Sequence, residues 1–170
     1  MHILCIMTDE SAMSFDQYDL RILQALQKDG SLTNGALSEL VRLSPSQCSR
    51  RRAALEAAGI IRGYHAKLNA TKLGFSMRAI VRVTLKTHTK DDHQNFSHWL
   101  GGQPEVLSAF SVTGSADYIL DVRVRDLENF SDFLHERLLI RPQVGHVQSD
   151  LVLKTLKDID ELNLAELGAP

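Results

Sequence analysis

Apolar and polar residues recur with two different periods, which divides the chain into a helical half and a mixed half. From Phe15 to Gln27 the apolar residues recur at helical spacing, so this segment is predicted to form an amphipathic helix. Asp16 is placed to cap its first turn in a capping box with Asp19, and Asp29-Gly30 ends it. The residues expected to face a core are Leu20, Ile22, Leu23 and Leu26.

Two more helices are predicted after short connections. Thr33 can cap the first of them, and Ser44 with Pro45 opens the other, because proline at the first helical position loses no hydrogen bond. This third helix runs to Ala58, where Gly59 stops it. About three or four residues separate the second and third helices, as in a DNA-binding helix-turn-helix. The apolar face of the second helix is predicted to be Leu37, Leu40 and Val41.

After Gly59 the pattern changes to short alternating segments. Residues 60–66 are predicted to form a strand and residues 69–74 a connector. The elements that follow have the order of a ferredoxin-like β-α-β-β-α-β domain, in which two helices cover one face of an antiparallel sheet. The fold class is therefore predicted to be α+β. The predicted segments are strands 77–86, 106–113, 118–125 and 144–156, helices 91–100 and 127–138, and a hairpin turn at 114–117.

The predicted domain organisation has five parts. A sheet with apolar residues on both faces needs a cover on the face away from its helices, so a homodimer is expected. The apolar run at the start is too short to span a bilayer, so it is a flexible extension, a strand that pairs with a partner, or an overlong start. The parts are an N-terminal extension (1–13), a helix-turn-helix domain (14–66), a linker (67–75), a second domain (76–157) and a C-terminal tail (158–170) with a short helix.

Basic charge is concentrated in one region, although the net charge of the 170 residues is −2. Between Arg42 and Arg62, five arginines accompany one acid, Glu56, and three of them are consecutive on the third helix. Such a helix presents its N-terminal residues to base edges in the major groove, while flanking cations contact phosphates. A solvated helix face is the plainer alternative, and Arg51 alone has the option of pairing with a carboxylate of its own domain. Double-stranded DNA is the expected partner, contacted by Ser44, Ser46, Gln47, Ser49, Arg50, Arg51 and Arg52.

Other chemical motifs are sparse in this sequence. Cys5 and Cys48 offer no disulfide framework, which favours a reducing cytoplasm. The sequence contains no Walker, GxSxG or HExxH motif, so we expect no catalytic residue and no cofactor. His88, His93 and His98 lack the i,i+4 spacing of helical metal ligands, so they are expected to face solvent and no metal site is expected.

The turn at 114–117 offers a second kind of binding site. Backbone N–H groups near Gly114 can donate to a carboxylate, and Asp117 can accept from an ammonium group, and these are the two ends of an amino acid. Glycine and aspartate are common in turns of every kind, so this pattern is a weak signal alone.

Three segments, residues 15–23, 43–51 and 59–66, together resemble the Lrp/AsnC (feast/famine) family of transcriptional regulators. With the β-α-β-β-α-β half, the resemblance spans about residues 14–157. It implies a winged helix-turn-helix, a ligand-sensing dimerisation domain, dimers that assemble into octamers or other rings, and amino-acid effectors bound between dimers. The effector residues that it implies are Thr113, Gly114, Asp117, Gln148 and Ser149.

Three residues depart from the family pattern. Arg42 stands where the family usually has glycine between its DNA-binding helices, and a positive φ there would cost an arginine about 1 kcal/mol. Arg52 replaces a usually apolar residue, so it either extends along the surface or adds a DNA contact. Ala116 replaces a common aromatic residue, which leaves the effector and its presence open.

Two competing classes of function remain at this stage. Sirohaem decarboxylases resemble these regulators in architecture, but they bind a tetrapyrrole through histidines and arginines of the C-terminal half. The arginine-rich third helix argues against such an enzyme. A structural partner that acts only by co-assembling with other regulators would have no DNA affinity when purified alone.

Overall fold

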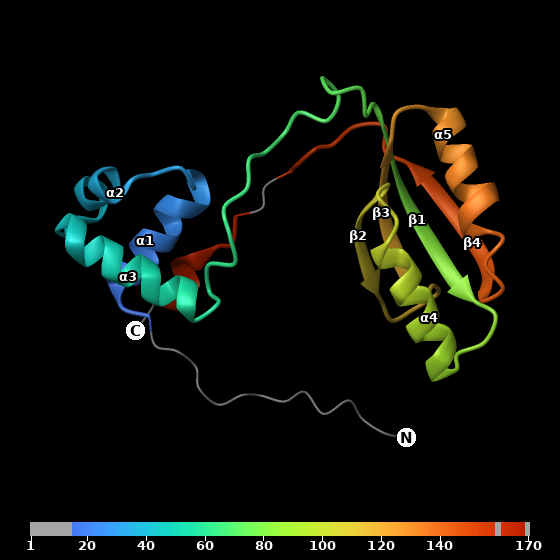
Figure 1. The fold of residues 1–170 in the computed structure, drawn as a ribbon, viewed down its shortest axis with the longest axis horizontal. Helices are drawn as coiled ribbons and strands as arrows, with labels where there is room; N and C mark the ends of the chain where they lie inside the picture. Colours follow the sequence, from blue (N-terminus) through green and yellow to red (C-terminus); the bar gives the residue numbers. More distant parts are fainter. Residues whose placement is uncertain (1–14, 159–160, 169–170) are drawn as a thin grey trace. The chain divides into compact units, whose positions relative to one another are not determined.

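The computed structural model describes residues 15–158 and 161–168. This described chain divides into two compact units, and each is considered by itself. The first unit contains the described residues up to Ala66 together with those beyond Lys157, and the second contains residues 67–157 (Figure 1). The predicted N-terminal extension, residues 1–13, lies outside the described residues.

Three helices build the first unit: α1 (Gln17–Lys28), α2 (Asn34–Val41) and α3 (Pro45–Ala57). The bounds of α1 and α3 match the predicted helices to within two residues at each end, and α2 begins directly after its predicted cap, Thr33. Their apolar faces meet in one small core, where burial of apolar surface is the main stabilising term. The buried residues of this core are Ile22, Leu26, Leu37, Val41, Cys48 and Leu55.

The predicted caps of these helices are confirmed, but one predicted core residue is wrong. The side chains of Asp16, Thr33 and Ser44 each accept a hydrogen bond from a backbone N–H of the first helical turn. Leu40 is 62% exposed, because α2 turns Leu37 and Val41 inward and leaves Leu40 beside Glu39 on its outer side.

Residues 60–66 are irregular, so the predicted strand is wrong. Gly59 and Gly63 have φ values of 70° and 155°, and the segment has no neighbouring strand within the described first unit with which to pair. Ile61 packs on the helical core instead. The tertiary contacts of the segment, rather than a β ladder, hold it in place.

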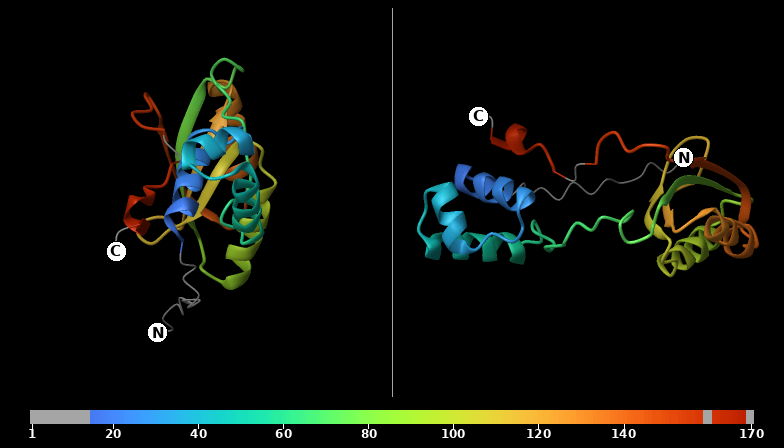
Figure 2. Two further views of the ribbon diagram at one scale, coloured as in Figure 1. Left: turned by 90° about the vertical axis from the view of Figure 1, so that its left-hand side faces the viewer. Right: turned by 90° about the horizontal axis from the view of Figure 1, so that it is seen from above.

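The described C-terminal residues return to the first unit. The side-chain amide of Gln27 on α1 donates to the backbone oxygen of Leu162 at 3.2 Å and accepts from its N–H at 2.7 Å. Leu164 is buried at the start of the 3-10 helix η2 (Leu164–Gly168), which lies beside α1 (Figure 2). The predicted short helix in the tail is therefore present, and it belongs to the helix-turn-helix unit.

The second unit has the predicted β-α-β-β-α-β order. All strand pairs are antiparallel, and the strand order in the sheet is β2-β3-β1-β4. The last strand ends five residues earlier than predicted, and Leu153 and Leu156 beyond it are exposed. The elements are β1 (Met77–Leu85), α4 (Lys90–Gly101), β2 (Val106–Ser111), β3 (Tyr118–Val124), α5 (Leu127–Asp132), the π-helix η1 (Phe133–Leu138) and β4 (Val144–Leu151).

Helices α4 and α5 cover one face of this sheet and leave the other face open (Figure 2). Alternate residues of β1 and β3 point toward the helices, as the two-residue period of a strand requires. Leu127, predicted to face inward, is 65% exposed because it lies at the first position of α5. The largest fully buried side chains of this core are Phe96, Phe133, Leu120 and Leu138.

Candidate DNA interface and effector site

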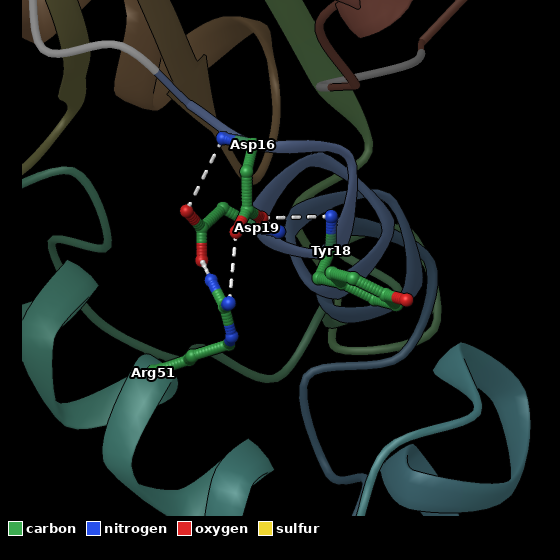
Figure 3. A network of polar contacts seen from close by, with 4 residues as sticks. All are labelled: Asp16, Tyr18, Asp19 and Arg51. Atoms are coloured by element: carbon green, nitrogen blue, oxygen red, sulfur yellow. Dashed lines mark hydrogen bonds and ion pairs between the residues drawn. The ribbon is translucent and has the colours of Figure 1, made fainter.

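Arg51 of α3 is held inside the first unit (Figure 3). Its guanidinium nitrogens lie 2.8 Å from Oδ2 of Asp16 and 2.7 Å from Oδ1 of Asp19, and the group stacks 5.6 Å from the centre of the Tyr18 ring. The same two carboxylates form the capping box of α1. Arg51 therefore ties α3 to the start of α1, which is the intradomain alternative that the sequence left open.

The ion pair shifts the pKa values of its members. Partial burial raises the pKa of Asp16, but hydrogen bonds from Asp19 N–H, the Arg51 side chain and Tyr18 N–H lower it by more, so it lies below its ordinary value. The hydrogen bond to Asp19 raises the pKa of Arg51, with smaller contributions from Asp16. Both groups are therefore charged at neutral pH.

Arg52 is also engaged within its own unit. Its guanidinium donates to the backbone oxygen of Leu32 at 3.0 Å, to the Tyr64 hydroxyl at 2.8 Å and to Glu56 at 3.2 Å. The Tyr64 hydroxyl donates in turn to Glu56 at 2.8 Å, and the pKa of Tyr64 is raised by burial first and by Glu56 second. Arg52 thus links the irregular segment 60–66 to α3 through a hydrogen bond to Tyr64. The apolar residue usual at this position could make only packing contacts.

Ser44 and Gln47 form the capping box of α3. The Gln47 side-chain oxygen accepts from Ser44 N–H at 3.0 Å, while the Ser44 hydroxyl accepts from Gln47 N–H at 3.2 Å. The Ser46 hydroxyl lies 3.0 Å from that of Ser44. These polar groups define where the helix begins, and because Pro45 has no N–H and Gln47 N–H is already bonded, Ser46 N–H is the donor of the first turn without a hydrogen-bond partner among the described residues.

Arg50 differs from the other two arginines of the triplet. It is exposed and, among the described residues, makes no hydrogen bond or ion pair. Ser46, Ser49 and Ala53 recur beside it at helical spacing, on the side of α3 away from the buried Cys48. This exposed face combines one free cation with short side chains that let a helix approach a groove closely.

Arg42 adopts a left-handed backbone conformation between α2 and α3, with φ 59° and ψ 48°. In the described part of the chain it is the one non-glycine residue with positive φ. The condition of the strain prediction, a positive φ at Arg42, is therefore met, and an L-residue is disfavoured there because its Cβ crowds the carbonyl.

The predicted effector turn is fastened to the end of β1. Asp117 donates its N–H to the oxygen of Val83 at 3.0 Å, and its Oδ2 accepts from Leu85 N–H at 2.7 Å. Thr113 and Gly114 are exposed, and Gly114 has φ 128°, which favours glycine. Backbone groups at the tip of this turn are open to solvent, while the Asp117 carboxylate already has partners.

Gln148 and Ser149 lie on β4, on the far side of β1 from β3 and the turn. Gln148 is opposite Arg82 and Ser149 is opposite Val81, so the two side chains point to different faces of the sheet. Two strand spacings of about 4.8 Å each separate β4 from β3. One copy of the chain therefore does not bring these residues together with Thr113 and Gly114.

The three histidines near α4 have different surroundings. His88 and His98 are exposed, as predicted. His93 is half-buried, and its Nδ1 lies 2.7 Å from the hydroxyl of the buried Tyr118, so the prediction of a solvent-facing side chain is wrong there. Its partner comes from a strand that is distant in sequence, which is why helical spacing did not indicate the contact.

None of the helices within the described ranges is long and apolar enough to cross a membrane.

Comparisons with known proteins agree with this geometry. The family profile "Winged helix-turn-helix DNA-binding" matches residues 15–62, and the profile "Lrp/AsnC ligand binding domain" matches residues 78–162. The leucine-responsive regulatory protein of Rhizobium meliloti is 36% identical over 152 residues, which cover 89% of this chain and 97% of that protein. The Bkd operon transcriptional regulator of Pseudomonas aeruginosa is 38% identical over 141 residues, which cover 83% and 92%.

Solved structures give the same result. A transcriptional regulator from Neisseria meningitidis, solved as a complex with L-methionine, is 42% identical and superposes with a TM-score of 0.87, covering 90% of this chain and 99% of that one. These relatives are transcriptional regulators and not enzymes, so the decarboxylase alternative is set aside and the predicted family and fold class are confirmed. The chain belongs to the Lrp/AsnC family of DNA-binding transcriptional regulators, with a winged helix-turn-helix and a ligand-binding domain.

Proposed function

We propose that the protein recognises its operator through the exposed face of α3, with Arg50 as the residue that reads a base. The observation that carries this proposal is the division of roles within the arginine triplet: Arg51 and Arg52 have partners in their own unit, whereas Arg50 is exposed. A bidentate pair between arginine and guanine contributes about 1 to 3 kcal/mol of discrimination. Arg50 is long enough to make that pair from a helix seated in the major groove.

The other predicted DNA contacts have supporting roles in this proposal. Ser46 and Ser49 lie beside Arg50 on the exposed face and can donate to bases or phosphates. Ser44 and Gln47 set the helix start, where the positive end of the helix dipole suits a phosphate. Arg51 and Arg52 act mainly by fixing the position of α3, and each adds positive potential for the DNA backbone.

The open face of the sheet is the proposed surface for a second copy. Phe110 on β2 is 57% exposed, and it pairs with Ile119, which lies on the face away from α4 and α5. Arg78 and Asp121 form a bidentate ion pair on the same face, at 2.9 and 2.6 Å. These two charged groups therefore satisfy each other and could be covered by a second sheet without losing their partners. A dimer carries two copies of α3, which suits half-sites about one helical turn of DNA apart.

The proposed effector is an amino acid or a related small metabolite. The relative from Neisseria meningitidis was solved with L-methionine, and the turn of this chain exposes backbone groups at Thr113 and Gly114. Gln148 and Ser149 are too far from that turn within one copy, so the pocket is completed between copies, in a larger ring such as an octamer. The protein acts in the cytoplasm, where its DNA lies.

Fluorescence anisotropy of the purified chain on its own upstream DNA tests this function. The titration is repeated with scrambled DNA, at two salt concentrations, and with and without pooled amino acids. We expect tighter binding to the upstream DNA than to scrambled DNA, and weaker binding at higher salt because binding releases counterions. The pooled amino acids should change the affinity for the upstream DNA. Equal and weak binding to both DNAs would contradict operator recognition, and binding unchanged by every amino acid would contradict the effector.

A further inference from the structure

Two histidines and one aspartate converge beside the turn that precedes β3. A ring nitrogen of His88, a ring nitrogen of His93 and a carboxylate oxygen of Asp117 all lie within 4.8 Å of one another. They come from three segments: the loop after β1, the first turns of α4 and the turn at 114–117. Imidazole nitrogen and carboxylate oxygen are the ligands that zinc and similar divalent transition metals prefer.

Two of the three ligands are oriented by further contacts. Oδ2 of Asp117 accepts from Leu85 N–H at 2.7 Å, which leaves Oδ1 directed at Nδ1 of His88, 3.4 Å away. Nδ1 of His93 is hydrogen-bonded to the hydroxyl of Tyr118 at 2.7 Å, and the Tyr118 ring packs 4.9 Å from the buried Phe96. A histidine that ligates a metal through one nitrogen commonly uses its other nitrogen in this way.

The loop that carries His88 is also held in place. The Asp92 carboxylate accepts from the hydroxyls of Thr87 and Thr89, at 2.6 and 2.5 Å, on both sides of His88. The His88 side chain itself is 62% exposed. Ligands of one tetrahedral zinc lie about 3.4 Å apart, and the three atoms here, within 4.8 Å of one another, are close to that spacing.

A simple ion pair does not account for this arrangement, because one histidine would suffice for the single carboxylate. The two imidazole rings lie nearly parallel, with an interplanar angle of 26° and centres 6.0 Å apart, and both face Asp117. A metal ion placed between them can take one nitrogen from each ring together with the Asp117 oxygen.

We propose that His88, His93 and Asp117 bind a divalent transition-metal ion of the zinc type. Three protein ligands leave one coordination position for water or for a small molecule with a nitrogen or oxygen donor. The ion would join the turn at 114–117 to the loop between β1 and α4. The sequence-based expectation of no metal site rested on the spacing of histidines along a helix. It did not consider Asp117, which comes from a different segment of the chain.

Metal binding by the full chain, with any affinity tag removed, tests this proposal without DNA or effector. Zn²⁺ is titrated by calorimetry, and Co²⁺ is added to detect the visible absorption of a tetrahedral site. The variants are His88→Ala, which changes an exposed side chain, and Asp117→Asn, which keeps an acceptor for Leu85 N–H. His98→Ala is the matched control, because His98 is an exposed histidine on the same helix as His93.

We expect about one metal ion per chain for the wild type and for His98→Ala. Both His88→Ala and Asp117→Asn should bind at least about tenfold more weakly, because loss of even an outer partner of a metal ligand weakens binding by that factor. The proposal is overturned if the wild type binds no metal, if both variants bind as tightly as the wild type, or if His98→Ala weakens binding as much as His88→Ala.

Discussion

The guanidinium of Arg51 lies 2.7 Å from Oδ1 of Asp19, thirty-two residues earlier in the chain. This contact joins the helix proposed to meet DNA to the first turn of α1. Both partners are largely shielded from solvent, with side-chain exposures of 26% and 19%. The neighbouring Arg50 has no such contact among the described residues, so two adjacent arginines of the same helix have separable roles.

Replacement of Arg51 by alanine should destabilise the first unit. The variant loses two charge-assisted hydrogen bonds and leaves the carboxylates of Asp16 and Asp19 close together without a cation. We expect a loss of about 1 to 2 kcal/mol in the free energy of unfolding, measured with urea. Arg50→Ala is the matched control and should stay within about 0.5 kcal/mol of the wild type. Equal stability of the two variants would contradict the structural role of Arg51.

Replacement of Arg42 by glycine should stabilise the protein. The left-handed backbone at φ 59° strains an L-residue, whereas glycine adopts it freely. We therefore expect the free energy of unfolding to rise by about 1 kcal/mol, measured by thermal or chemical denaturation. Arg42→Ala removes the same side chain but keeps the Cβ, so it should show no such gain. A gain of the same size in both variants would mean that the arginine side chain, and not the backbone, carries the strain.

Asp16 should make the first unit sensitive to acid. Its pKa in the folded chain lies below the ordinary value, so its stabilising effect is complete above about pH 4 and is lost as the pH falls through the folded pKa. Asn is as good an N-cap as Asp but does not titrate. The melting temperature of Asp16→Asn should therefore fall less between pH 6 and pH 3 than that of the wild type. Parallel melting curves over that range would contradict this role.

Association through the open face of the sheet can be tested at Phe110. A glutamate there would place a charge on the surface proposed to meet a second sheet, so Phe110→Glu should shift the chain from dimers or larger assemblies to monomers in sedimentation. Leu127→Glu is the control, because Leu127 is at least as exposed as Phe110 but lies on α5, on the opposite side of the sheet. Unchanged assembly of Phe110→Glu would remove this face as the interface.

Local signals were enough to predict most of this fold. The caps at Asp16, Thr33 and Ser44 and the alternation along β1 depend on residues a few positions apart, and they are present as predicted. Leu40 and Leu127 differ because orientation toward a core depends on which neighbour a helix meets. The spacing of Leu40 and Leu127 along their helices was compatible with the buried face and with the exposed face.

The site was harder to predict, because its roles depend on contacts between distant segments. The triplet at 50–52 left two roles open for Arg51, and it did not indicate that Arg52 finds a partner in Tyr64 or that Arg50 lacks one among the described residues. The same limit applies to His93, whose hydrogen-bond partner, Tyr118, lies on β3. Residue type indicated which side chains carry chemistry, and the tertiary fold decides which of them are free to use it.

The measurement that tests the central claim most directly compares Arg50→Ala with Lys154→Ala in anisotropy titrations on the upstream DNA. Lys154 is an exposed cation of the second unit, so both variants lose one positive charge. We expect Arg50→Ala to lose about tenfold or more in affinity for the upstream DNA and most of its preference over scrambled DNA. Lys154→Ala should bind like the wild type. If Arg50→Ala keeps both affinity and preference, α3 does not read the operator through Arg50, and the account is wrong.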